Sequence, residues 1–164
     1  MYTEMTDRSW TVAGISKIKG EESRYVRIPD RLFREESIVK PGFPVLWHYE
    51  KTVGVLIISR NELKEENYEY SGESRKFREG DSEYTVGIPK AFFSDFKGRG
   101  EPKIDPRAAD KINLQKDGWL HFVFHEDMTE TDPKTCYVLT EDQFDKRFSD
   151  SDQLQEIEDV PRFY

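Results

Sequence analysis

The sequence predicts a mainly β protein in which two similar halves close one β-barrel with pseudo-twofold symmetry, accompanied by short helices. Two internal repeats carry this prediction. The segment Arg24–Phe33 (RYVRIPDRLF) returns 60 residues later as Tyr84–Phe93 (YTVGIPKAFF). The segment Lys40–Glu50 (KPGFPVLWHYE) returns 76 residues later as Lys116–Glu126 (KDGWLHFVFHE). Because a unit this small cannot bury its own apolar face, each copy needs the other.

Each copy opens with a short strand that a proline ends. Val26 and Ile28 alternate with Tyr25 and Arg27, which is the period of a strand with one buried face. Pro29 cannot donate to a sheet ladder, and it suits the start of a short helix whose apolar pair faces the core. The second copy follows the same pattern. The predicted core residues are Val26, Ile28, Leu32, Trp47, Val86, Ile88, Phe92 and Phe122.

A turn and two further strands complete each copy. Lys-Pro-Gly and Lys-Asp-Gly are turn sequences, and an apolar strand follows each of them. The last strands are expected at Val53–Ser59 and Thr135–Thr140, each followed by a polar stretch that starts a helix. The second copy is 16 residues longer (76 minus 60), and the extra residues fall in the Gly/Pro-rich loop 97–112.

These limits divide the chain into a first half at 12–63, a linker at 64–75, a second half at 76–148 and an acidic tail at 149–164. The net charge of −8 is concentrated near the C-terminus, since residues 126–164 hold four Lys/Arg and twelve Asp/Glu. The single cysteine, Cys136, excludes an intrachain disulfide and favours a reducing, cytoplasmic location. The longest apolar run, Val53–Ile58, is too short to cross a membrane.

A strand ending in Ile-Pro, a short helix with Leu and Arg, Pro-Gly and two apolar strands resemble the AbrB/MazE/SpoVT swapped-hairpin domain. In that family two hairpins intertwine into one DNA-binding barrel, and a tandem pair in one chain is similar to the MraZ arrangement. The resemblance covers residues 14–63 and 77–144. It implies two AbrB-like swapped-hairpin halves and a cytoplasmic, non-catalytic transcriptional regulator that binds double-stranded DNA through its phosphate backbone.

Two groups of basic residues are the candidate DNA contacts. Arg31 and Arg34 share one face of the short helix, and Tyr25 and Arg27 leave the buried face of the strand. The loop 97–112 adds further bases beside its glycines and prolines. Together they suit phosphates, with Tyr25 and Arg27 near base edges. The predicted DNA-binding residues are Arg24, Tyr25, Arg27, Arg31, Arg34, Lys97, Arg99, Lys103 and Arg107.

Departures from the family pattern favour a second function. Arg24-Tyr25 stands in place of the usual Gly-Arg, and the second copy has Thr85 and Ser94 where the family has basic residues. Acidic neighbours surround the arginines, so local ion pairs on a solvated surface are the alternative interpretation. The competing function is a protein–protein interaction module, antitoxin-like or an assembly protein, that kept the barrel and lost DNA binding. A second copy of the chain is a further partner left open.

The acidic tail, 149–164, also has two interpretations. It either covers the basic groove of a protein partner, as antitoxin tails of the resembled family do, or folds back on the basic face of its own chain. The remaining candidates predict no catalysis, metal or cofactor. His121 and His125 lie on one face of a strand without a carboxylate or cysteine to complete a metal site, and Cys136 reads as a small core residue.

Overall fold

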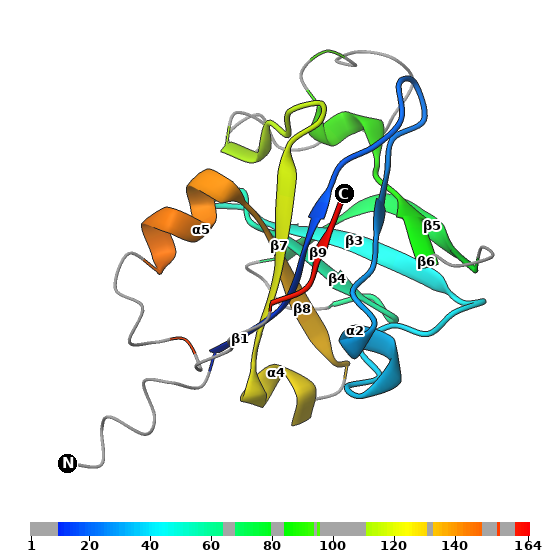
Figure 1. The fold of residues 1–164 in the computed structure, drawn as a ribbon, viewed down its shortest axis with the longest axis vertical. Coiled ribbons are helices and arrows are strands. Elements are labelled where there is room, and N and C mark those ends of the chain that lie inside the picture. Colours follow the sequence, from blue (N-terminus) through cyan, green and yellow to red (C-terminus); the bar gives the residue numbers. More distant parts are fainter. Residues whose placement is uncertain are drawn as a thin grey trace.

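The computed structural model describes residues 10–63, 68–79, 84–93, 95, 111–130, 133–148, 154 and 160–164, with backbone alone for 70–79 (Figure 1). Within that part of the chain, nine strands and a few short helices confirm the mainly β class. The elements are β1 (Trp10–Lys17), β2 (Tyr25–Arg27), α2 (Arg31–Arg34), β3 (Pro44–Glu50), β4 (Leu56–Ser59), β5 (Tyr68–Glu79), β6 (Tyr84–Gly87), η1 (Lys90–Phe92), β7 (Trp119–His125), α4 (Glu126–Glu130), β8 (Thr135–Thr140), α5 (Glu141–Arg147) and β9 (Arg162–Phe163).

The strands form one series in the order β2-β6-β5-β3-β4-β8-β7-β1-β9. Neighbouring strands are antiparallel except for β1 and β9, which are parallel. The series is open. Just beyond β1, Lys19 forms a single bridge with Tyr25 of β2, and the two residues exchange backbone hydrogen bonds of 2.9 Å each. The closed barrel expected from the sequence therefore stays a proposal.

The first strands of the two repeats, β2 and β6, pair directly with each other. Val26 lies opposite Val86, its equivalent at the 60-residue offset. The amide of Ile28 donates to the carbonyl of Tyr84 at 2.8 Å, and the amide of Ile88 donates to the carbonyl of Arg24 at 2.9 Å. At the 60-residue offset, Ile28 corresponds to Ile88 and Arg24 to Tyr84, so the two hydrogen bonds are equivalent to each other. Exchanging the two strands therefore leaves the contact unchanged.

A strand precedes each repeat, and neither was predicted. β1 precedes the first copy, and β5 precedes the second although its start lies in the segment 64–75, which the sequence assigned to a linker. β5 pairs with β3 in the same register in which β1 pairs with β7: Val45 faces Arg75 as His121 faces Ile15. In the segment 64–75, the alternation is limited to Tyr68 and Tyr70, which is too short a pattern to predict a strand, and β5 forms where it pairs with β3.

The eight predicted core residues are all at most 3% exposed, which confirms the alternation deduced from the sequence. They belong to one large apolar cluster between the two halves. A second cluster lies under α5, where Val123, Leu139 and Phe148 pack together and Phe144 covers them. The helix begins with a reciprocal cap: Gln143 donates its amide to the Thr140 hydroxyl and accepts from the Thr140 amide, each at 3.1 Å.

The predicted short helices after Pro29 and Pro89 are α2 and the single 3₁₀ turn η1. Figure 1 places α2 and α4 at the same end of the molecule and shows β9 running along β1. None of the helices in the described part of the chain has the length and apolar character that crossing a bilayer requires.

Candidate nucleic-acid interface

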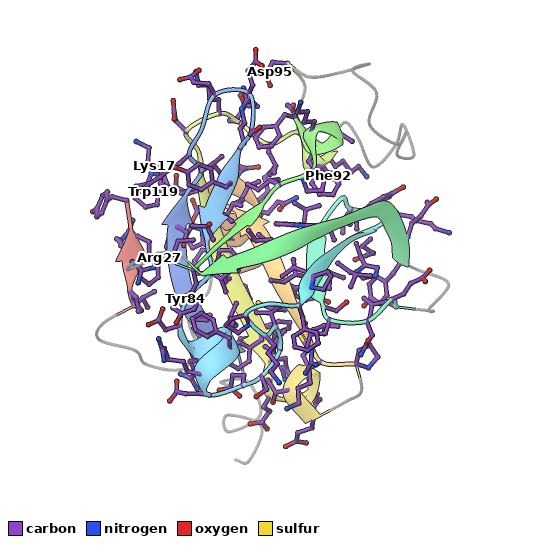
Figure 2. The ribbon with its side chains drawn as sticks, turned by 90° about the vertical axis from the view of Figure 1, so that its right-hand side faces the viewer. Lys17, Arg27, Tyr84, Phe92, Asp95 and Trp119 are labelled. Atoms are coloured by element: carbon purple, nitrogen blue, oxygen red, sulfur yellow. The ribbon has the colours of Figure 1, made fainter. Side chains whose placement is uncertain are left out.

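The arginines predicted to contact DNA are distributed around the β2–β6 strand pair. Arg24 precedes β2, Arg27 ends it, and Arg31 and Arg34 are the first and last residues of α2. Figure 2 shows Arg27 and Tyr84 toward one end of this pair and Asp95 at the opposite end of the molecule. Thus the four arginines do not form one patch, since Arg24 lies with Asp95 and the other three lie around α2.

Arg24 is the buried partner of an ion pair with Asp95, whose own side chain is 54% exposed. The Arg24 side chain is 3% exposed and donates two hydrogen bonds to the Asp95 carboxylate, at 2.8 and 2.5 Å. The guanidinium also stacks on Phe93, 4.6 Å from the ring centre. Its hydrogen bond to Asp95 raises the pKa of Arg24, and the same bond lowers the pKa of Asp95. This burial removes Arg24 from the exposed bases among which the sequence placed it.

Arg27 leaves the buried face of β2 as predicted, but the C-terminus covers it. The guanidinium lies 4.2 Å from the ring centre of Phe163, and one of its terminal nitrogens is 3.7 Å from Asp30. Its Nε is buried without a hydrogen-bond partner in the described structure. Tyr25, two residues earlier, is 37% exposed. Any base-edge contact by Arg27 would therefore require that Phe163 move away.

The helix α2 pairs its arginines with its own carboxylates. Arg34 reaches Asp30 at 3.5 Å, so Asp30 lies between Arg27 and Arg34. Arg31 contacts both Glu35 at 3.7 Å and Glu36 at 3.1 Å. Three arginines thus share three carboxylates, and the Lys134 ammonium, which donates to the Glu36 carbonyl at 3.1 Å, adds a positive charge beside them. The spacing of three and four residues on a short helix brings these opposite charges together.

Aromatic rings line the same surface. Phe33 lies 4.5 Å from Tyr84 between ring centres, and the Arg34 guanidinium stacks on both rings, at 5.3 and 5.5 Å. At the 60-residue offset, Phe33 and Tyr84 correspond to Phe93 and Arg24, which are in contact at the opposite end of the strand pair. Each end of the β2–β6 pair is therefore closed by a phenylalanine of one copy against a residue of the other.

The second predicted basic group lies outside the described residues. It consists of Lys97, Arg99, Lys103 and Arg107. Nearby, the described Lys111 donates to the carbonyl of Thr52 at 2.6 Å. In the first copy, the arginines expected to contact phosphates have other partners. Arg24 is buried, the Phe163 ring covers Arg27, and Arg31 and Arg34 pair with carboxylates.

The C-terminal end folds back on its own chain. β9 pairs with β1, where Arg162 faces Ile15 and Phe163 faces Ser16. The amide of Ile15 donates to the carbonyl of Pro161 at 2.9 Å. Residues 149–153 and 155–159, which hold most of the tail's acidic side chains, are outside the described residues. The described part of the tail therefore favours the interpretation in which the tail folds back on its own chain.

The histidines and the cysteine have core surroundings. Burial, and after it the positive charge of Arg162, lower the pKa of His121 to about 4. The His121 ring stacks on Phe144 at 4.3 Å. Burial likewise lowers the pKa of His48 to about 4 and raises the pKa of the Cys136 thiol. Across the residues that the structure describes, no group of three His, Cys, Asp or Glu side chains is placed to hold a metal ion.

Two residues that shape this surface were missed by the sequence analysis. Asp95 carries no motif, and its pairing with Arg24 spans 71 positions. Phe163 lies in the tail 149–164 and carries no motif either. A scan against protein-family models, a search of the curated proteins and a search of the solved structures each found no match for this chain.

Proposed function

We propose that this chain is a non-catalytic protein–protein interaction module, built as two AbrB-like swapped-hairpin halves that close one pseudo-twofold barrel. Two contacts support the closure, because they lie between β1 and β2, the strands that an eight-stranded ring would bring together. Lys19, two residues beyond β1, bridges to Tyr25, and the Ser16 hydroxyl donates to the Arg27 carbonyl at 2.8 Å. The reciprocal hydrogen bonds of Ile28 and Ile88 support the twofold relation between the halves.

The observation that carries the function is the charge balance around α2. Arg27, Arg31 and Arg34 each lie within 4 Å of a carboxylate, at 3.7, 3.1 and 3.5 Å. DNA binding draws its free energy largely from cations that replace the counterions of the phosphates. A carboxylate beside each cation repels the phosphate that should approach it. A surface that mixes paired charges and aromatic rings suits a protein partner better.

DNA binding is the second candidate, and the exposure of Arg34 favours it. The Arg34 side chain is 57% exposed, and its ion pair with Asp30 is open to solvent. Exposed pairs contribute only ~0–1 kcal/mol, so a phosphate that approaches Arg34 would displace Asp30 at small cost. On this alternative the chain is a transcriptional regulator whose first copy supplies the phosphate contacts.

Retention of labelled duplex DNA at ~50 and ~200 mM salt distinguishes the two candidates. The wild-type chain should retain no DNA at either salt concentration. The triple variant Asp30→Asn/Glu35→Gln/Glu36→Gln removes the carboxylates that pair with α2, and it should retain DNA at the lower salt concentration only. The control variant Glu141→Gln/Asp142→Asn/Asp145→Asn makes the same charge change on α5, where all three side chains are exposed, and should retain none.

Salt-dependent retention by the wild-type chain would overturn the proposal. If Arg34→Ala also flattened the slope of log affinity against log salt by ~0.9, one phosphate contact would be assigned to Arg34. That result would establish the DNA-binding alternative.

A further inference from the structure

Lys40, Phe43 and Arg60 form an exposed aromatic patch, here called the Phe43 patch. Phe43 is 47% exposed. The Lys40 ammonium lies 5.2 Å and the Arg60 guanidinium 5.3 Å from the centre of its ring. Unlike the arginines of α2, neither cation has a carboxylate within ion-pair distance in the described structure. Within the described residues, the patch is therefore an apolar ring with two positive charges that no carboxylate pairs with.

The backbone holds this patch in place. Lys40, Pro41, Gly42 and Phe43 form a tight turn, closed by a 3.1 Å hydrogen bond from the Phe43 amide to the Lys40 carbonyl. Gly42 has a φ of 88°, which is the value that the third residue of a type II turn needs, and proline suits the second position of that turn. Arg60 follows β4 directly, and β4 pairs with β3 through Leu46 and Ser59. The ring and both cations are thus anchored to neighbouring strands before any partner binds.

The equivalent ring in the second copy is covered by a peptide segment. Trp119 corresponds to Phe43 at the 76-residue offset. The Tyr164 ring meets Trp119 edge-on at 5.1 Å, and the Arg162 guanidinium lies 5.7 Å from the Trp119 ring. Both come from the C-terminal end, which lies as an extended strand against β1.

The backbone position that holds this strand also occurs twice. β9 lies against Ile15 and Ser16 of β1, and the matching residues of β5 at the 60-residue offset are Arg75 and Lys76. The register is shared, because Ser16 faces Leu120 as Lys76 faces Pro44. β6 pairs with β5 only from Phe77 onward. Among the described strands, none lies against the backbone of Arg75 and Lys76 on the edge opposite β3.

We infer that the Phe43 patch and the adjoining edge of β5 form a docking site for an extended acidic peptide with an aromatic residue, supplied by a protein partner. The peptide would add to β5 as a short strand, as β9 adds to β1. Its aromatic side chain would pack on Phe43, and its carboxylates would pair with Lys40 and Arg60. This inference rests on the proposed function, since it names the site and the class of partner.

A peptide fits this site better than DNA does for two reasons. The equivalent position beside Trp119 holds a peptide strand, which is the class of ligand proposed for Phe43. An exposed strand edge offers alternating backbone donors and acceptors, which another strand satisfies and a phosphate backbone does not.

The probe is a fluorescein-labelled peptide with the sequence EIEDVPRFY, which is residues 156–164 of this chain. It has three carboxylate side chains and two aromatic rings, and fluorescence anisotropy of the full chain measures its binding. We expect saturable binding that Phe43→Ala weakens at least about tenfold, as for a central aromatic contact. Lys40→Gln and Arg60→Gln should each weaken it several-fold at low salt. Phe43 is half exposed, so its removal should leave the unfolding transition unchanged.

Two controls separate this site from the one beside Trp119. Trp119→Phe should leave peptide binding to the Phe43 patch unchanged, because the two rings belong to different copies. A peptide with the acidic residues replaced, QIQNVPRFY, should lose the contribution of Lys40 and Arg60, so that Lys40→Gln no longer weakens its binding.

Equal peptide affinity of the wild-type chain and Phe43→Ala would overturn this site. If the wild-type chain also retained no DNA, the interaction module would stand and its partner would dock elsewhere. If duplex or single-stranded DNA competed with the peptide and needed Phe43, the patch would be a nucleic-acid site, and both this inference and the proposed function would fall.

Discussion

Val26 lies directly opposite Val86 in the antiparallel pair of β2 and β6, and both side chains are at most 1% exposed. They are equivalent residues of the two repeats, so each copy completes the core of the other at this point. The contact explains why one chain carries the motif twice. A single copy would leave this apolar face open to water.

Removing either isoleucine beside this pair should destabilise the whole fold. Ile28 and Ile88 are 0% and 3% exposed, and each follows its strand in the same way. Ile28→Ala or Ile88→Ala should lower the free energy of unfolding by ~2–5 kcal/mol, which urea denaturation measures. Val53→Ala is the control, because Val53 is 44% exposed and should change stability by less than ~0.5 kcal/mol. A change within error at both isoleucines would contradict the shared core.

Asp95→Asn should destabilise the protein at neutral pH, because it leaves the buried Arg24 charge without its carboxylate. The pKa of Asp95 is lowered by its bond to Arg24, so the ion pair stabilises the fold above the ordinary carboxyl pKa. That stabilisation is lost as the pH falls toward the lowered value. The difference in melting temperature between wild type and Asp95→Asn should therefore shrink on acidification.

The matched control for Asp95 is Glu35, its equivalent at the 60-residue offset. Glu35 pairs with Arg31 on the surface, where both side chains are more than a third exposed. Glu35→Gln should change the melting temperature little, since exposed pairs contribute little to stability. Equal effects of the two substitutions would mean that the burial of Arg24 has no energetic consequence.

His121→Phe should make stability less dependent on pH between ~6.5 and ~4. The pKa of His121 is about 4 in the fold, below its ordinary value of 6.5. The unfolded chain therefore takes up a proton first as the pH falls, and stability is lost across this range. Phenylalanine keeps the stacking on Phe144 and does not titrate. Urea denaturation at several pH values, with His125→Phe as the control, measures the slope. An unchanged slope in His121→Phe would contradict the assignment.

Phe163→Ala should loosen the C-terminal strand from β1. The Phe163 ring stacks on the Arg27 guanidinium. The Ile15 amide donates to the Pro161 carbonyl, so its hydrogen-exchange rate measures how firmly the C-terminal strand is held. Hydrogen exchange at Ile15 should accelerate about tenfold if the strand loses ~1.4 kcal/mol. The Lys19 amide, which bonds to Tyr25, is the internal control and should keep its rate. Equal acceleration at both amides would indicate global destabilisation instead.

The sequence by itself determined the repeated framework of this protein. The alternation of Val26 and Ile28, the proline that follows and the apolar pair of the short helix are local patterns, and they fixed the core and the helix positions. Local patterns suffice there because strand and helix periods dictate which side chains share a face. The same logic failed for β5, since its start alternates only at Tyr68 and Tyr70 and its pairing depends on the edge of β3.

Only the tertiary structure decided the state of the arginines. In the sequence, Arg24 and Arg27 are two bases three positions apart at the first short strand, and both were predicted to contact DNA. In the fold, Asp95 from the other copy buries Arg24, and Phe163 from the C-terminus covers Arg27. Whether a cation can meet a phosphate depends on which groups lie across from it in space, and those groups come from distant parts of the chain. Sequence spacing does not predict such contacts, because the energy of a charge pair depends on the distance between the charges in space and not on their separation along the chain.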